Sequence, residues 1–303
     1  MKQPSAVSEV KTKMRRTMLY LPGNNPSMLV RGHLFGPDGI IMDMEDAVPL
    51  SQKDAARIMI SRFLKRGDFG SVEVTVRING ADTPFWKKDL EAVIPYKRLD
   101  GIRLPKADSV QTIKDVDEEL SILEDKYGIP QGHTKIFCIL ETAYGVWHAY
   151  DIATASKRIT AILPGGEDLV ADLRTSRSQD GIELEWTRKM IVIAARAAGV
   201  NAIDSMFPRV SDDEGLRKDA ELSKQLGFDG KSVIHPNQIP IIHEVFTPTE
   251  KEIEKAQRII AAAEDARKRG LGAVSVDGRM VDIPVVRRAE YTLVKAGLKK
   301  EGE

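Results

Sequence analysis

Cysteine is almost absent from this sequence, which has a single one, Cys138, among 303 residues. One thiol cannot form a disulfide within the chain, so the small disulfide-stabilised secreted domains are excluded and a reducing cytoplasm is expected. Cys138 lies within an apolar run, and we interpret it as a buried core thiol rather than a nucleophile. Residues 1–16 are polar and basic without an apolar core, which argues against a signal peptide.

Long apolar runs and an excess of either charge are also missing. No stretch approaches about eighteen apolar residues, so no membrane-spanning helix is expected. Lys+Arg and Asp+Glu both number 45, which gives a formal net charge of zero. Generic binding to nucleic acid or to an anionic membrane is therefore not expected. The length allows one large globular domain or two smaller ones.

Short apolar runs alternate with helical patterns along most of the chain. Unbroken apolar runs of this length predict strands that are buried on both faces, as in a parallel sheet. Eight strand segments are predicted: Arg16–Gly23, Gly39–Asp46, Val72–Asn79, Gly101–Lys106, Ile136–Thr142, Ile159–Asp168, Asn201–Ser205 and Phe228–His235. Eight strand–helix units within about 250 residues predict an α/β fold of the (β/α)₈ TIM-barrel type. A doubly wound open sheet is the alternative.

A change of pattern after the eighth strand predicts a C-terminal extension. We expect residues 1–246 to form the catalytic barrel and residues 247–303 a helical and hairpin extension that acts as a lid or subunit contact. The Thr249–Glu252 stretch has the Thr-x-x-Glu pattern of a capping box and should open a helix. Asp277–Gly278 is a typical hairpin turn, and Pro284 should lie at the start of the last helix.

Charged side chains follow the predicted strands. In a (β/α)₈ barrel the functional groups lie at the C-terminal ends of the strands. The candidates are Asp43, Glu45, Asp46, Arg77, Arg103, Lys106, Glu141, Asp168, Asp204 and His235. This mixture of acids and cations is suited to an anionic substrate that is bound through a metal ion.

Glu141 and Asp168 are the candidate metal ligands, because each follows one of two neighbouring predicted strands. An oxygen-only pair without a nearby His or Cys suits Mg²⁺ better than Zn²⁺. Acids at helix starts are also favoured by the helix dipole without any ligand. That alternative explains Glu167 well and Asp46 in part, but it explains Glu141 poorly because Glu141 follows directly on a buried strand.

Other strand-end residues leave more than one interpretation open. Gly165 and Gly166 allow close backbone approach, so their amides could hold a substrate carboxylate. Arg77 is either a surface charge or, as we favour, a two-pronged contact to carboxylate or phosphate. Lys106 is either a Schiff-base lysine or a solvated, phosphate-facing side chain, and the second is favoured. His235 is interpreted as a corner between strand and helix rather than as a catalytic group.

Several motifs together carry a family resemblance. They are Arg16–Asn24, Met42–Ala47, Val76–Asn79, Ile102–Lys106, Leu140–Thr142, Gly166–Leu169 and Phe228–Pro236. In these motifs, which cover nearly the whole chain in the expected order, the sequence resembles the beta subunits of citrate lyase, within a wider group that includes malyl-CoA and citramalyl-CoA lyases. Leu173–Ser178 and Gly181–Leu184 look more like the citrate lyase subunits than their relatives.

The resemblance implies a Mg²⁺-dependent retro-Claisen lyase that cleaves a citryl thioester into oxaloacetate and an acetyl thioester. By this resemblance Glu141 and Asp168 bind the metal, and Arg77 and Glu141 contact the substrate. Gly166 and Glu167 are expected at the substrate as well. Asp282 is expected to be the acid–base group, supplied by a neighbouring chain, although its sequence context alone favours an N-cap of the last helix.

Further expectations concern Glu45, Asp46 and the partners. The two acids are expected to anchor metal-bound waters or to orient Arg77. The partners would be the acyl carrier (gamma) and transferase (alpha) subunits of a citrate lyase complex, with a homo-oligomer of this chain. A stand-alone lyase acting on malyl-, citramalyl- or citryl-CoA is the alternative. A class I aldolase using Lys106 and a non-enzymatic scaffold in an acyl-carrier complex are further alternatives.

Overall fold

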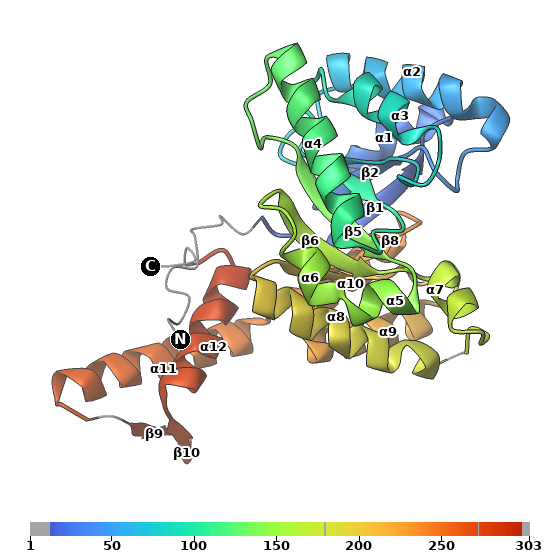
Figure 1. Cartoon of the computed structure of the whole chain (residues 1–303). Coiled ribbons are helices and arrows are strands. Elements are labelled where there is room, and N and C mark those ends of the chain that lie inside the picture. Colours follow the sequence, from blue (N-terminus) through green and yellow to red (C-terminus); the bar gives the residue numbers. More distant parts are fainter. Residues whose placement is uncertain (1–12, 179, 272, 299–303) are drawn as a thin grey trace. The chain divides into compact units, whose positions relative to one another are not determined.

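The computed structural model describes residues 13–178, 180–271 and 273–298 (Figure 1). Residues 1–12, for which the sequence predicts no signal peptide, lie outside this description. The chain divides into two compact units, one from Arg15 to Glu244 and one that includes the chain from Val245 onward. Of the helices that are described, none combines the length and apolar character needed to cross a membrane.

A closed barrel of eight parallel strands forms the first unit, in the order β1 to β8. The strands are β1 (Thr17–Pro22), β2 (Gly39–Asp43), β3 (Glu73–Arg77), β4 (Gly101–Leu104), β5 (Lys135–Leu140), β6 (Ile159–Pro164), β7 (Asn201–Asp204) and β8 (Gly230–Val233). The last strand pairs with the first, Lys231 opposite Thr17 and Val233 opposite Leu19. The predicted TIM-barrel fold is therefore confirmed, and the open-sheet alternative is wrong.

Helices connect successive strands along the chain (Figure 1). They are α1 (Pro26–Arg31), α2 (Lys53–Arg66), α3 (Trp86–Val93), α4 (Val110–Tyr127), α5 (Ala143–Trp147), α6 (Ala149–Ala153), α7 (Glu167–Asp172), α8 (Glu185–Ala198), α9 (Asp213–Leu226) and α10 (Gln238–Phe246). The described residues also form three short 3₁₀ helices: η1 (Gly32–Phe35), η2 (Leu50–Gln52) and η3 (Ile182–Leu184).

The two faces of the strands form separate buried layers, as expected for a sheet that is covered by helices. One cluster contains Met18, Ile41, Phe137, Ala161, Leu163 and Ile203, with the partly buried Tyr20 packed against it. Because successive strand residues point to opposite faces, Cys138 faces away from Phe137. Cys138 is fully buried, and burial raises the pKa of its thiol, which confirms it as a core residue.

The second unit contains α11 (Glu250–Lys268), the hairpin of β9 (Val274–Val276) and β10 (Arg279–Val281), and α12 (Ile283–Lys295). The predicted capping box is present: the Thr249 hydroxyl accepts the Glu252 amide and the Glu252 carboxylate accepts the Thr249 amide. Asp277 and Gly278 both have positive φ, +50° and +72°, which confirms the predicted tight hairpin turn.

Candidate functional site

Asp43 and Arg77 form the centre of the site at the ends of β2 and β3, where they are register partners. Arg77 donates from Nε and Nη2 to the two oxygens of Asp43, each at 2.7 Å. Asp43 also accepts the amides of Glu45, at 2.9 Å, and Ala47, at 3.2 Å. With its side chain only 1% exposed, Asp43 fixes both the guanidinium and the loop that follows β2.

Two further acids contact Arg77 from the same loop. Nη1 of Arg77 lies 2.7 Å from Glu45 Oε2 and 3.2 Å from Asp46 Oδ2. The guanidinium carbon of Arg77 lies 5.0 Å from the centre of the Tyr20 ring. Burial raises the pKa of Glu45 to about 8, with Arg77 lowering it and nearby carboxylates raising it. These contacts are the ones needed for Glu45 and Asp46 to orient Arg77; their part in catalysis stays a prediction.

Lys53, which the sequence analysis does not predict as a site residue, stabilises the loop that follows β2. Its Nζ donates to the carbonyl oxygens of Met44 and Glu45, each at 2.7 Å. Burial lowers the pKa of Lys53, while nearby acids raise it. A lysine at the start of a helix gives no sequence signal for such a role, because only the fold shows which carbonyl groups it reaches.

Glu141 directly follows β5 and is held by backbone on two sides. Its Oε2 accepts the Lys106 amide at 2.8 Å, and Lys106 has a φ of +48°, an uncommon conformation for lysine. A Cβ on Gly165 would lie 2.5 Å from Glu141 Cγ, so glycine is required there. The pKa of Glu141 is raised to about 7, mainly by burial; the Lys106 amide opposes this rise, and the charge of Asp168 contributes to it.

Asp168 is exposed in the first turn of α7, after β6, which pairs with β5. The two predicted metal ligands thus follow neighbouring strands, and the charge of Asp168 contributes to the raised pKa of Glu141. Within residues 13–178, 180–271 and 273–298, no three His, Cys, Asp or Glu residues are grouped to hold a metal. Two carboxylates, of which Asp168 is exposed, still fit Mg²⁺, which is usually bound by only one or two carboxylates and keeps several waters.

Gly166 and Glu167 begin α7, with Gly166 at the N-cap position. A Cβ on Gly166 would meet no atom within 4 Å, so the backbone faces open space there. Glu167 is exposed. This placement leaves both residues accessible, and their predicted contact with substrate stays a prediction.

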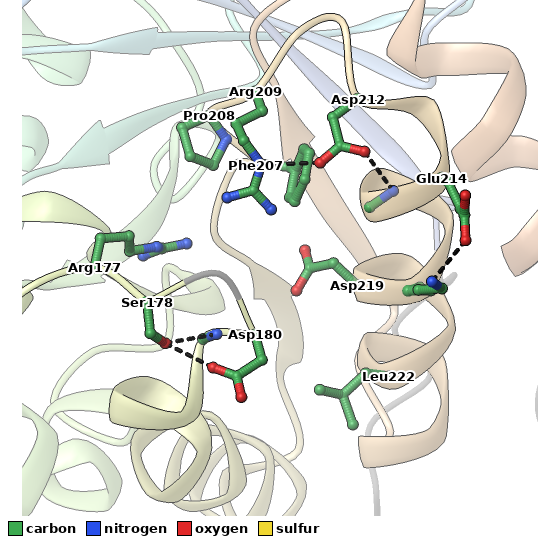
Figure 2. Close-up of a pocket in the computed structure, with 13 residues that line it drawn as sticks. Arg177, Ser178, Asp180, Phe207, Pro208, Arg209, Asp212, Glu214, Asp219 and Leu222 are labelled. Carbon is green, nitrogen blue, oxygen red and sulfur yellow. Dashed lines mark hydrogen bonds and ion pairs between the residues drawn. The ribbon is translucent and has the colours of Figure 1, made fainter.

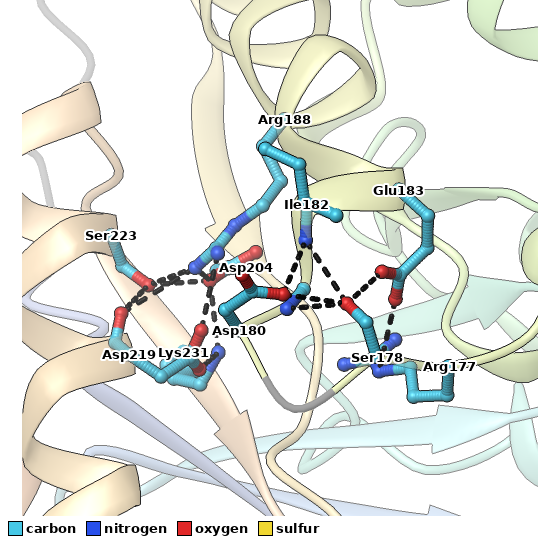
Figure 3. A network of polar contacts seen from close by, with 11 residues as sticks. Arg177, Ser178, Asp180, Ile182, Glu183, Arg188, Asp204, Asp219, Ser223 and Lys231 are labelled. Atoms are coloured by element: carbon cyan, nitrogen blue, oxygen red, sulfur yellow. Dashed lines mark hydrogen bonds and ion pairs between the residues drawn. The ribbon is translucent and has the colours of Figure 1, made fainter.

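Asp204 does not belong to this site, so the expectation that groups it with the other strand-end acids is wrong. It is fully buried and bonds to Arg188, Ser223 and Lys231, the last at 2.8 Å (Figure 3). Burial favours a raised pKa for Asp204, but Lys231 and Arg188 hold it well below its usual range. The preceding residue, Ile203, belongs to the Phe137 cluster, so Asp204 points to the opposite face of the strand.

A cavity of about 630 Å³ borders this network (Figure 2). Arg177 and Arg209 line it, and Arg209 pairs with Asp212 at 2.9 Å. Asp219 belongs to both features, since it lines the cavity and lies 2.7 Å from Lys231 Nζ. None of the predicted site residues lines this cavity.

The remaining candidates have local roles in the structure. The Lys106 side chain is 46% exposed, with Nζ 3.8 Å from Asp82. The ring of His235 accepts the Asn237 amide at 3.2 Å, which is the corner role expected for it. Asp282 accepts the Val285 amide at 3.2 Å and caps α12. The cap is observed, and the acid–base role of Asp282 stays a prediction.

The chain is similar to known proteins of one family. Residues 16–236 match the family described as HpcH/HpaI aldolase/citrate lyase. The citrate lyase subunit beta of Leuconostoc mesenteroides subsp. cremoris is 45% identical over 281 residues, covering 93% of each chain. The (3S)-malyl-CoA thioesterase of Cereibacter sphaeroides is 36% identical over 281 residues, covering 93% of this chain and 94% of the other.

A solved structure shows the same likeness in three dimensions. CitE from Mycobacterium tuberculosis, in complex with magnesium, acetoacetate and coenzyme A, superimposes with a TM-score of 0.76 at 31% identity. The match covers 93% of this chain and 98% of that one. The chain therefore belongs to the HpcH/HpaI aldolase/citrate lyase family and is an enzyme of this lyase family.

Proposed function

We propose that this chain is the beta subunit of a citrate lyase and cleaves a citryl thioester, held on an acyl carrier subunit, into oxaloacetate and an acetyl thioester. The observation that carries the proposal is the placement of Glu141 and Asp168 after neighbouring strands, in a chain 45% identical to a citrate lyase beta subunit. The solved structure of CitE from Mycobacterium tuberculosis contains magnesium, which supports Mg²⁺ as the cofactor of this chain.

Arg77 binds an anionic group of the substrate in this proposal. Asp43 occupies its Nε and Nη2 edge. Nη1 faces Glu45 and Asp46, on the more exposed side of the loop. An incoming carboxylate would therefore meet the Nη1 side while Asp43 keeps the guanidinium plane fixed, so that Arg77 can stabilise the enolate charge as it develops.

Glu141 and Asp168 would hold Mg²⁺, and the ion would supply Lewis-acid polarisation of the substrate hydroxyl and carboxylate oxygens. Asp282 of a neighbouring subunit would take the hydroxyl proton. The carbon–carbon bond then breaks, its electron pair passes to the thioester as an enolate, and the hydroxyl carbon becomes the keto carbon of oxaloacetate. Returning one proton to the enolate carbon gives the acetyl thioester. Gly166 and Glu167 would position the substrate beside the metal ligands.

A stand-alone lyase that acts on a coenzyme A thioester is the second candidate. It is favoured by the 36% identity to a (3S)-malyl-CoA thioesterase and by the coenzyme A bound to the Mycobacterium tuberculosis protein. The two candidates share the metal site and differ in the thioester carrier. The citrate lyase proposal includes carrier and transferase subunits as partners, a homo-oligomer of this chain and a cytoplasmic location.

The test is to assay the purified chain with Mg²⁺ against citryl-, malyl- and citramalyl-CoA, and then to add purified carrier and transferase subunits with citrate. Citrate cleavage that needs all three components, and that is lost on adding a chelator, supports the proposal. Glu141→Gln should abolish it, whereas Glu118→Gln, an exposed acid on α4, should not. Rapid turnover of malyl-CoA by the chain alone, without cleavage in the complex, would support the second candidate.

A further inference from the structure

Arg103, on β4, is a fully buried cation without an adequate partner. It is 0% exposed, and its Nη1 and Nη2 have no hydrogen-bond acceptor within residues 13–178, 180–271 and 273–298. Its Nε reaches only the hydroxyl of Thr75, at 3.4 Å. Its guanidinium carbon lies 4.9 Å from the centre of the Phe137 ring. The other buried arginines of the barrel have acids: Arg15, for example, donates to both oxygens of Glu73.

This arrangement is unfavourable in the unliganded chain. A buried charge costs free energy unless it is paired, and arginine does not deprotonate near neutral pH. Arg103 is also the register partner of Arg77, so two guanidinium groups start from neighbouring positions on β3 and β4. The pKa of Arg103 is lowered to about 10, mainly by burial; Tyr20 and Glu73 act in the opposite direction, and the charges of Arg15 and Arg77 contribute to the lowering.

The position of Arg103 connects it to the candidate site. Asp43, Arg77 and Arg103 occupy one register level on β2, β3 and β4. Tyr20, which is partly exposed, lies within electrostatic reach of both arginines and of Glu141. Arg77 contacts three acids, whereas no ion pair joins Arg103 to an acid among the described residues. Glu73, which influences Arg103 through its charge, is already paired with Arg15. The described part of the barrel interior beside the site therefore contains one positive charge without a directly bonded acid.

We propose that Arg103 is a carboxylate subsite of the active centre, which receives the distal carboxylate of the substrate and of the dicarboxylic oxo-acid product. The proposal rests on the proposed function, since it assigns the carboxylate at the 2-oxo end to Arg77 and the metal ligands. Arg103 would then favour thioesters that release a dicarboxylic oxo acid over those that release a monocarboxylic one. Its unpaired nitrogens supply the two parallel donors that a carboxylate accepts.

A purely structural role gives different expectations. If Arg103 only stacks on Phe137, its replacement should affect all ligands alike and should lower stability. If Arg103 instead binds a substrate carboxylate, its replacement by methionine, which is of similar length, should remove an unpaired buried charge from the unliganded protein. The unliganded protein should then unfold at the same or a higher temperature.

The experiment measures Mg²⁺-dependent binding of oxaloacetate and of pyruvate to the full chain by titration calorimetry. For Arg103→Met we expect affinity for oxaloacetate to fall by about tenfold or more, in the range of a lost charge-assisted contact, and affinity for pyruvate to stay within about twofold. Arg103→Lys should restore part of the oxaloacetate affinity. Arg77→Met, as the comparison, should weaken both oxo acids.

Equal losses for both acids in Arg103→Met, or unchanged affinity for oxaloacetate, would overturn the subsite. A lowered unfolding temperature together with equal losses would assign Arg103 to packing instead. If the unmodified chain binds neither acid with Mg²⁺, the proposed function is wrong and the subsite is wrong with it. If the unmodified chain binds both and Arg103→Met behaves identically, only the subsite is wrong.

Discussion

Replacing Asp43 by asparagine tests whether this carboxylate organises the site. Each of its oxygens accepts two hydrogen bonds, one from Arg77 and one from a loop amide. In Asp43→Asn one oxygen becomes an NH₂ group, which faces two donors and can bond to neither. Arg77 also loses the charge that lies closest to its Nε and Nη2 edge.

The expected loss of stability follows from these contacts. A hydrogen bond to a charged group contributes about 1.5–3 kcal/mol and an ordinary one about 1 kcal/mol. Breaking a buried ion pair costs about 3–5 kcal/mol when no other counter-charge remains. Glu45 and Asp46 still pair with Arg77, so we expect about 2–4 kcal/mol. For a unit of this size that corresponds to a Tm lower by roughly 5–15 °C.

The assay is urea unfolding followed by circular dichroism, combined with a thermal scan of the metal-free protein. Asp46→Asn is the matched control, because Asp46 contacts the same arginine but its side chain is 66% exposed. That variant should change the free energy of unfolding by no more than about 1 kcal/mol. If the two variants unfold at the same denaturant concentration, the idea that Asp43 anchors Arg77 is refuted.

Three further predictions concern the reaction. A crystal structure with Mg²⁺ and oxaloacetate should show metal–oxygen distances of about 2.0–2.1 Å to Glu141 and Asp168, with waters or ligand oxygens completing an octahedron; a metal on His235 would contradict this assignment. Arg77→Lys keeps the charge but loses the planar fork, so kcat/KM should fall at least about tenfold, roughly 1.4 kcal/mol of transition-state stabilisation; near-normal kinetics would remove Arg77 from the site. Asp282→Asn and Glu141→Gln chains, each expected to be inactive alone, should regain activity when mixed under conditions of subunit exchange; confirmed exchange without recovery would exclude a site shared between chains, and full activity of Asp282→Asn alone would exclude its catalytic role.

The sequence predicted those features that depend on local pattern. Buried apolar runs predicted the eight strands, and each barrel strand overlaps a predicted segment, with β5 beginning one residue earlier than predicted, at Lys135. The Thr249 capping box and the Asp277–Gly278 turn were predictable because their residue types impose one local geometry. Glu141 stood out because a carboxylate directly after a buried strand has no common structural explanation.

Features that depend on which way a side chain points were not predictable. Asp204 was expected beside the other acids, but a difference of one residue along a strand moves a side chain to the opposite face. Asp43 is one of three acids, and nothing in the sequence shows which one pairs with the Nε and Nη2 edge of Arg77. The unpaired state of Arg103 is a property of its surroundings inside the barrel, which only the assembled strands reveal.

Closure of the barrel between β1 and β8 has a consequence for the newly made chain. Thr17 pairs with Lys231, so one edge of β1 has no neighbour until β8 has left the ribosome. At about 5–20 residues per second this interval lasts roughly 10–40 s. During that time the edge exposes unpaired backbone groups that can join other chains. The yield of correctly folded protein should therefore depend on the supply of chaperones. Lower growth temperatures should raise its soluble yield.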